Sequence, residues 1–193
     1  MDNVQIIFLW GTLCVLAIPG PTNTLLFVSG ITMGFCASLN LVLAEVGAYI
    51  LSISFLRYLV IPALSETTNK ALYLCCSIYL AYLALQLWRS GDKKFHNANQ
   101  INFYRVFVTT LLNPKNLIFA FGIFPGRAEM SSDILSYWII FSATCVSAAF
   151  CWIAGGAVLQ SSLFYKPYLN RFYRGEALLL VGFAIFMLFI IVW

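Results

Sequence analysis

Two charged side chains in the middle of long apolar stretches are the first candidates for chemistry. Glu45 and Lys115 each lie about halfway along such a stretch. If the stretches cross a membrane as helices, a charge at the centre costs about 2.5–3.5 kcal/mol, so neither side chain should face lipid. The structural interpretation is that the two residues form an ion pair, or that Lys115 extends its ammonium to the membrane surface.

The alternative interpretation makes both residues ligands. Lys115 would bind a carboxylate and Glu45 an ammonium, which together match a small zwitterionic substrate such as an amino acid. If Glu45 does not bind the amine, it is a candidate carrier of a coupling proton, because a lone carboxylate at membrane depth is costly to ionise.

The segment Pro19-Gly20-Pro21-Thr22-Asn23 predicts a break in the first apolar stretch. Each proline lacks an N–H and clashes with the carbonyl four residues earlier, while Gly20 permits dihedrals that other residues resist. A bilayer tolerates the freed backbone groups only beside protein or a wet cavity. Thr22 and Asn23 add side-chain hydrogen-bonding groups at this point.

A second break is predicted at Asn113-Pro114-Lys115-Asn116, near the middle of the fourth apolar stretch. Pro114 frees a carbonyl and disfavours the helical conformation at Asn113. Either break alone is explained by an ordinary proline kink. The pair is more informative, because each break lies in the first span of a three-span half.

Halves with an odd number of spans have opposite orientations, so the matched breaks predict an inverted repeat with two broken helices facing each other near the midplane. The half-helix N-termini would favour an anion there. The predicted substrate-binding residues are Pro19, Gly20, Pro21, Thr22, Asn23, Glu45, Asn113, Pro114, Lys115 and Asn116.

The elements that carry these residues follow from composition. Hydrophobic residues make up 62% of the chain and charged residues 9%, whereas a soluble domain carries about 25% charge. The apolar excess must therefore face lipid. The long unbroken runs predict an all-α polytopic membrane protein with six transmembrane helices, of which the first and fourth are broken. The expected spans are 4–28, 35–56, 70–88, 103–125, 135–160 and 175–193.

The whole chain, 1–193, is expected to form a single membrane transporter domain. Repeat one covers about 1–90 and repeat two 103–193, with a polar loop at about 89–102 between them. Seven of the 11 Lys and Arg residues fall on the side of this loop. The positive-inside rule therefore places the loop in the cytoplasm and both termini outside.

Small residues spaced four apart in two spans predict close helix packing. Packing within the molecule is the favoured interpretation, and a homodimer interface is the alternative. The residues are Ala44, Ala48 and Ser52 in the second span, and Ala143, Ser147, Cys151 and Gly155 in the fifth.

Several function classes lack support in the sequence. The six cysteines contain no C-x-x-C pair, and His96, the one histidine, lies in the polar loop, so no metal site is predicted. Phosphate-binding, dinucleotide-binding and hydrolase motifs are missing, so neither a cofactor nor an enzymatic activity is expected. The modest net charge of +4 does not indicate nucleic-acid binding. A small-solute channel is the second transport hypothesis, and a membrane-embedded enzyme or assembly factor is the alternative from another class.

The order and spacing of three segments resemble the LysE/RhtB family of amino-acid exporters. They are the Pro-Gly-Pro element at 19–26, the Asn-Pro-Lys element at 112–115, and the third span at 71–84. Ala84 stands where the family usually has glycine, and Ser38, Ala44 and Ala48 occupy the small positions of the second span. The resemblance implies a secondary transporter of the bacterial cytoplasmic (inner) membrane that exports amino acids or close derivatives, driven by an ion gradient, commonly of protons.

Overall fold

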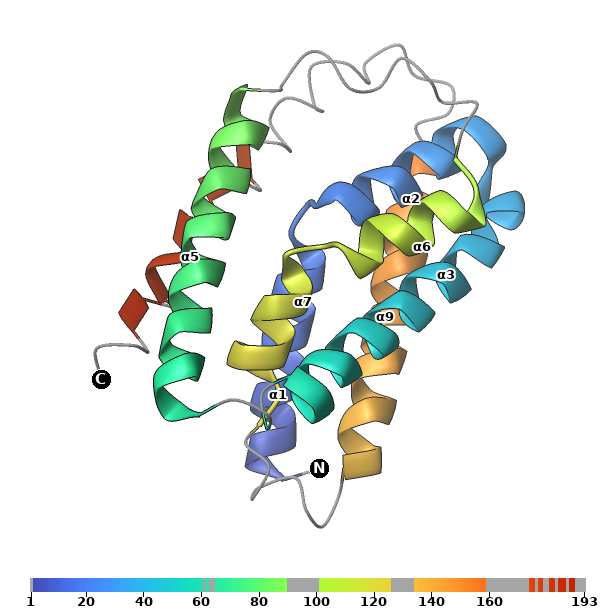
Figure 1. Cartoon of the computed structure of the whole chain (residues 1–193). Coiled ribbons are helices and arrows are strands. Elements are labelled where there is room, and N and C mark those ends of the chain that lie inside the picture. The colour runs from blue at the N-terminus through green and yellow to red at the C-terminus, as the bar shows by residue number, and fades with distance from the viewer. Residues whose placement is uncertain are drawn as a thin grey trace. The chain divides into compact units, whose positions relative to one another are not determined.

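The structure is a computed structural model of the whole chain (Figure 1). It describes residues 2–60, 62, 65–89, 101–125 and 134–158, and short pieces at 174–175, 177–178, 181–182, 184–186 and 188–189. Every secondary-structure element in these ranges is a helix.

The first half of the chain contains a broken helix and two further helices. Their bounds are α1 Asn3–Ala17, α2 Pro21–Met33, α3 Phe35–Ser54, the π-helix η1 Phe55–Val60, and α5 Glu66–Arg89. Gly34 joins α2 to α3 in one residue with a φ of 83°, a conformation that favours glycine. At the start of α1, Asp2 and Gln5 form a reciprocal capping box.

The second half begins with a shorter broken helix. Its elements are α6 Phe103–Leu111, α7 Lys115–Ile118, the π-helix η3 Phe119–Ile123, and α9 Ile134–Val158. The side chain of Asn102 caps α6 by accepting a hydrogen bond of 2.8 Å from the N–H of Arg105.

Four of the six predicted spans coincide with membrane-compatible segments. The helices Phe35–Val60 and Ile134–Val158 are each long and apolar enough to cross a bilayer. The pairs Asn3–Ala17 with Pro21–Met33, and Phe103–Leu111 with Lys115–Ile123, qualify if each bent pair is one span. The predicted third span lies within α5, and the sixth, 175–193, is described only in short helical pieces. The count of six therefore stays a prediction.

The chain divides into two compact units, each built from both sequence halves. The first unit comprises Met1–Ile53 and Ala98–Ser161, and the second comprises Ser54–Asn97 and Ser162–Trp193. This division fits two repeats that each give a broken helix and a straight helix to the first unit and a third helix to the second. The opposite orientation of the repeats remains a prediction.

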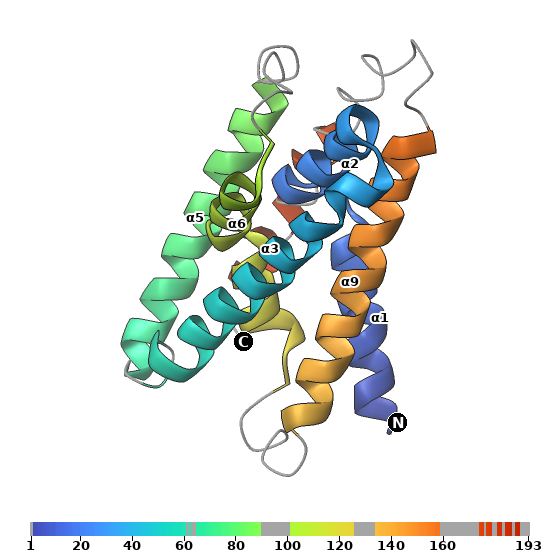
Figure 2. The same cartoon turned by 90° about the vertical axis from the view of Figure 1, so that its right-hand side faces the viewer.

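Within the first unit, α9 runs along α1 and crosses α2 (Figure 2). The crossing with α2 depends on two glycines. A Cβ on Gly30 would overlap the carbonyl oxygen of Ile153, and a Cβ on Gly156 would overlap that of Phe27. The backbones of α2 and α9 therefore approach so closely that only glycine fits at these two positions.

The small-residue stripe predicted for the second span is buried, as expected. Ala44 and Ala48 are both fully buried on α3. Ser52 is half-buried and donates a hydrogen bond of 3.4 Å to the carbonyl of Leu111. This face of α3 therefore packs inside the first unit.

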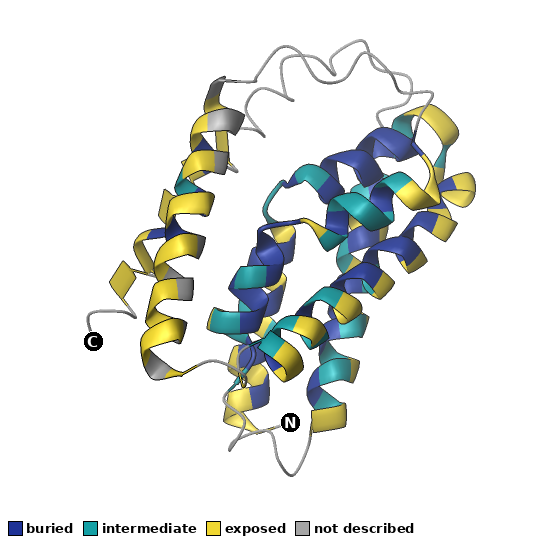
Figure 3. Ribbon diagram, in the orientation of Figure 1, coloured by how far each residue is buried: buried dark blue, intermediate teal, exposed yellow. Residues whose placement is uncertain are grey.

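The corresponding prediction for the fifth span is wrong for three of four residues. Ala143, Ser147 and Cys151 are exposed on the surface of α9, whereas Gly155 is half-buried, and a Cβ added to it would lie 3.5 Å from the ring of Phe27. Figure 3 shows the buried and exposed faces of the helices in the first unit. The buried face of α9 lies to one side and contains Phe141, Cys145, Ala149, Ile153 and Gly156. Because lipid is as apolar as a protein interior, small apolar residues do not by themselves show which face packs. A homodimer contact through the exposed face stays a prediction.

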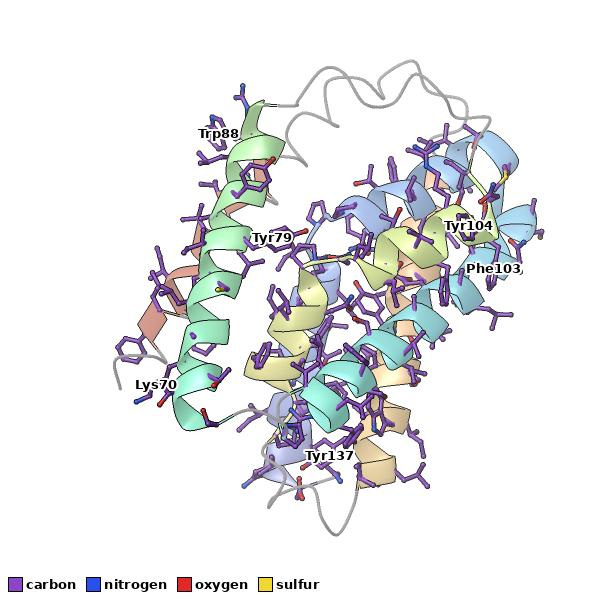
Figure 4. The ribbon with its side chains drawn as sticks, viewed as in Figure 1. Lys70, Tyr79, Trp88, Phe103, Tyr104 and Tyr137 are labelled. Atoms are coloured by element: carbon purple, nitrogen blue, oxygen red, sulfur yellow. The ribbon has the colours of Figure 1, made fainter. Side chains whose placement is uncertain are left out.

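The second unit has a small core of its own. Leu80 and Ala84 on α5 pack with Ala177 and Ala184 from the C-terminal pieces. The guanidinium of Arg174 lies 5.7 Å from the ring centroid of Trp88, at the end of α5 (Figure 4). This cation–π contact joins the end of α5 to a C-terminal piece of the second unit.

Candidate functional site

The first break covers residues 18–20. α1 ends at Ala17, Ile18 and Gly20 are extended, and α2 leaves at 62° to α1. Pro21 is the first residue of α2, where its missing N–H has no intrahelical partner to lose. No side chain caps this helix start, so the positive end of α2 is available to an anion.

Donors from three elements satisfy the carbonyls that the first break frees. The amide of Asn23 donates to the carbonyls of Leu16 at 2.7 Å and Ile18 at 2.8 Å. The indole N–H of Trp152 on α9 donates to Leu16 at 3.2 Å. Lys115 Nζ donates to Ile18 at 2.6 Å. Each of the two carbonyls therefore has two donors, one local and one distant in sequence.

The second break covers residues 112–114 and bends the chain by 50°. The amide of Asn116 donates to the carbonyls of Thr110 at 2.7 Å and Leu111 at 2.9 Å. The backbone N–H of Asn113 also donates to Thr110, at 3.0 Å. Asn113 Oδ1 accepts from the N–H of Lys115 at 3.0 Å. The start of α7 is therefore capped locally, unlike the start of α2.

The two breaks share a short internal repeat. Residues 20–23 read Gly-Pro-Thr-Asn, and residues 113–116 read Asn-Pro-Lys-Asn. In both, the asparagine two positions after the proline turns its amide back onto two freed carbonyls. The repeated Pro-x-Asn pattern was available in the sequence and identifies the two breaks as equivalent.

The two breaks face each other, as predicted. Asn113 Nδ2 donates to Thr22 Oγ1 at 3.1 Å, and Thr22 Oγ1 lies 3.0 Å from Thr110 Oγ1. Lys115 reaches across to Ile18 in the first break. The predicted polar residues are thus joined in one network in the middle of the first unit. All of them are at most 3% exposed: Thr22, Asn23, Asn113, Lys115 and Asn116.

Glu45 on α3 completes the group. Its side chain is 1% exposed, and its Oε2 has no hydrogen-bond partner among the described residues. The charge of Lys115 acts on the Glu45 carboxyl, and both charges act on the buried thiol of Cys145 on α9. Lys115 is 1% exposed, so its ammonium does not extend to the membrane surface.

The model of the LysE type translocator family matches residues 13–190. The chain belongs to this family. Among curated proteins and among solved structures, no match to the chain was found. The LysE-type translocator is thus an all-α polytopic membrane transporter, and its family consists of translocators rather than enzymes.

Sequence reasoning missed three residues of the translocator's central network. Thr110 lies one helical turn before Asn113 and joins the two breaks through Thr22. Trp152 lies inside a predicted span, whereas tryptophans that anchor a helix at the membrane surface lie at span ends. Its position therefore indicated another role. Cys145 carried no signal, because a buried cysteine is most often a small apolar residue.

The translocator's site combines a fixed cation, a carboxyl and an uncapped helix start. Lys115 and α2 can bind an anionic group, and Glu45 can bind a cation or a proton. Pro19, Gly20, Pro21 and Pro114 shape the two breaks and offer no side-chain chemistry of their own. A fixed cation, a carboxyl and an uncapped helix start together suit the binding and release of a small charged molecule.

Proposed function

We propose that this LysE-type translocator exports amino acids or close derivatives from the cytoplasm as a proton-driven secondary transporter. The observation that carries the proposal is that Lys115 and Glu45, two opposite charges that act on each other, are both buried where the two helix breaks meet. Opposite charges at one buried point match a small zwitterion, which brings both counter-charges in a single molecule.

In this proposal Lys115 binds the substrate carboxylate. Its ammonium now donates to the carbonyl of Ile18, a neutral acceptor. A carboxylate is the stronger acceptor, because charge-assisted hydrogen bonds are roughly twice as strong as neutral ones. Ile18 would not be left unsatisfied by the exchange, since the amide of Asn23 also donates to it.

Glu45 has two alternative roles. As a ligand it binds the substrate amine. As a proton carrier it alternates between the neutral and ionised forms. This role is supported by its buried Oε2, which has no hydrogen-bond partner in the part of the chain that the structure describes. Either way, the chain acts as one transport domain of 1–193 in the inner membrane, with both termini outside and the 89–102 loop in the cytoplasm. A cytoplasm-dependent reporter that is active at the C-terminus would contradict this topology.

Counterflow of labelled amino acids into proteoliposomes, with and without a pH gradient, tests the proposal. The wild-type protein should exchange at least one amino acid and accumulate it when a pH gradient is imposed. Exchange of none of the standard amino acids would refute the proposal. Accumulation that ignores the pH gradient would refute only the proton coupling.

Glu45→Gln separates the two roles of the carboxyl. If Glu45 binds the amine, the variant loses binding and exchange together. If Glu45 carries the proton, exchange continues while gradient-driven accumulation is lost. Glu66→Gln, which removes a carboxyl from the second unit, is the matched control and should behave as wild type.

A further inference from the structure

Three helices of the first unit repeat one pattern around the proposed substrate site. Each places an aromatic residue four positions from a titratable one, and therefore on the same helical face one turn away. The pairs are Glu45 and Tyr49 on α3, Lys115 and Phe119 on α7 and η3, and Cys145 and Phe141 on α9.

The pairs align into two layers. The polar layer is Glu45, Lys115 and Cys145, which act on one another electrostatically. The aromatic layer is Tyr49, Phe119 and Phe141. Its ring centroids are 5.6 Å apart for Tyr49 and Phe119, 5.9 Å for Tyr49 and Phe141, and 5.1 Å for Phe119 and Phe141, all edge to face. All three rings are fully buried.

We propose that the aromatic layer determines which amino acids are carried, by contacting the substrate's side chain. The inference rests on the proposed function in the form in which Lys115 binds the substrate carboxylate and Glu45 binds its amine. Those two groups are common to all amino acids, so the polar layer cannot tell one from another. Discrimination must come from residues next to it.

The helix breaks and the aromatic layer both lie next to the polar layer, and they differ in the kind of substrate side chain that each can accept. On the side of the breaks, Thr22, Asn113 and Thr110 are hydrogen-bonded to one another. An apolar side chain inserted there would leave buried polar groups without partners. Apart from the hydroxyl of Tyr49, the aromatic layer presents ring edges and faces, so an apolar side chain meets far fewer polar groups there.

Charge restricts the substrate further. Among the six residues of the two layers, the charges belong to Glu45 and Lys115, which the substrate's own amine and carboxylate occupy. A charged side chain would enter the aromatic layer without a counter-charge, which is strongly unfavourable in a buried place. The substrate class that fits is therefore an amino acid with a neutral, apolar side chain.

The same layer limits side-chain size. The rings are fully buried and in mutual contact, so a bulky side chain must displace at least one of them. Loss of one ring should therefore favour large substrates over small ones. A single methylene in an apolar pocket changes selectivity by about 10–200-fold, and a ring is larger.

Proteoliposome counterflow of alanine, leucine, phenylalanine and lysine tests the inference with Phe141→Ala. Wild-type protein should exchange neutral apolar substrates and exclude lysine. The variant should raise the phenylalanine-to-alanine rate ratio about tenfold or more. Phe141→Leu, which keeps most of the volume, is measured if Phe141→Ala does not accumulate, with a change in the same direction expected.

Phe8→Ala is the matched control. Phe8 is buried in the same aromatic cluster, but it contacts Phe124 and Tyr137 rather than the three rings of the layer. Tyr137 lies near the start of α9, at the end of the first unit (Figure 4). The control should leave the ratio unchanged.

The outcomes separate the two proposals. An unchanged ratio in folded, active Phe141 variants, or an equal change in Phe8→Ala, would show that the rings only fill the core and would overturn the inference. Wild-type exchange of lysine in preference to neutral amino acids would overturn it as well. The proposed function would survive these results, and it fails only if wild-type protein exchanges no amino acid.

Discussion

At the first helix break, each freed carbonyl accepts a hydrogen bond from a distant part of the chain as well as from Asn23. At the second break, most donors are local. Trp152 and Lys115 reach Leu16 and Ile18 from α9 and α7. At the second break, the N–H of Asn113 bonds to Thr110, and Asn113 caps α7 with its side chain. One Pro-x-Asn pattern therefore gives a first break whose carbonyls depend more on distant donors and a second break whose carbonyls depend more on local ones.

The helices that follow the two breaks, α2 and α7 with η3, also differ in how they pack. α2 is locked to α9 by the glycine crossing at Gly30 and Gly156. Gly30 lies nine residues after Pro21 of the first break. The equivalent position in the second break, nine residues after Pro114, is Ile123. The second broken helix has no glycine at that place and continues instead as the π-helix η3, an irregularity often found at functional sites.

The largest effect is expected from Gly156→Ala, which disrupts the close crossing of α2 and α9. The added methyl would overlap the carbonyl of Phe27, so α2 and α9 must separate, at a cost of about 3 kcal/mol or more. Thermal unfolding of the purified protein measures the loss. Gly47→Ala, where a Cβ meets nothing within 4 Å, is the control and should be neutral or gain up to about 1 kcal/mol. Equal stability of the two variants would contradict the crossing.

Lys115→Ala should have the next largest effect, on transport. The variant loses the cation that distinguishes the second break from the first, where Thr22 holds the same place in the repeat. Loss of a charged hydrogen bond of about 1.5–3 kcal/mol predicts a 10–100-fold lower exchange rate. The exposed Lys70 on α5 offers the control Lys70→Ala. Wild-type exchange by a folded Lys115→Ala protein would remove Lys115 from the site.

Alanine substitutions of the two asparagines compare the breaks directly. In Asn116→Ala, the carbonyl of Leu111 keeps only the 3.4 Å contact with Ser52, and the expected loss of unfolding free energy is about 2 kcal/mol. In Asn23→Ala, both carbonyls keep a distant donor, and the expected loss is about 1 kcal/mol. Denaturation of the purified variants in detergent measures both losses.

A double variant tests whether Asn23 and Trp152 share the carbonyl of Leu16 as their acceptor. Trp152→Phe combined with Asn23→Ala leaves Leu16 without either side-chain donor, so the combined loss should exceed the sum of the single losses. Strict additivity would show that the two donors do not share that carbonyl.

Thr22→Val should have the smallest effect. It removes the hydroxyl that links Asn113 and Thr110 but keeps the shape of the side chain. Thr110 keeps its bond to the carbonyl of Val106, so we expect a loss of about 1 kcal/mol and exchange reduced by a few-fold. The reduction should be similar for all substrates, in contrast to the Phe141 variants, and a selective change would place Thr22 in contact with the substrate side chain.

The sequence was sufficient for the features that depend on local chemistry. Proline removes a backbone donor wherever it stands, so both breaks and their polar neighbours could be predicted from residues 19–23 and 113–116 alone. Glu45 and Lys115 were predictable as inward-facing for a similar reason, because lipid rejects a charge irrespective of the fold. The stretches of apolar residues fixed the helical class, since a bilayer leaves the backbone few other ways to satisfy its hydrogen bonds.

Only the tertiary structure decided which helical faces pack and which groups meet. The small stripe of α3 is buried while the similar stripe of α9 is exposed, because apolar side chains gain little by exchanging lipid for protein and so carry no signal of direction. The donors from Trp152 and Lys115 come from 136 and 97 residues away in the chain. Their hydrogen bonds to two carbonyls, and the edge-to-face packing of Tyr49, Phe119 and Phe141 next to the charged residues, depend on how several helices converge, which no local pattern encodes.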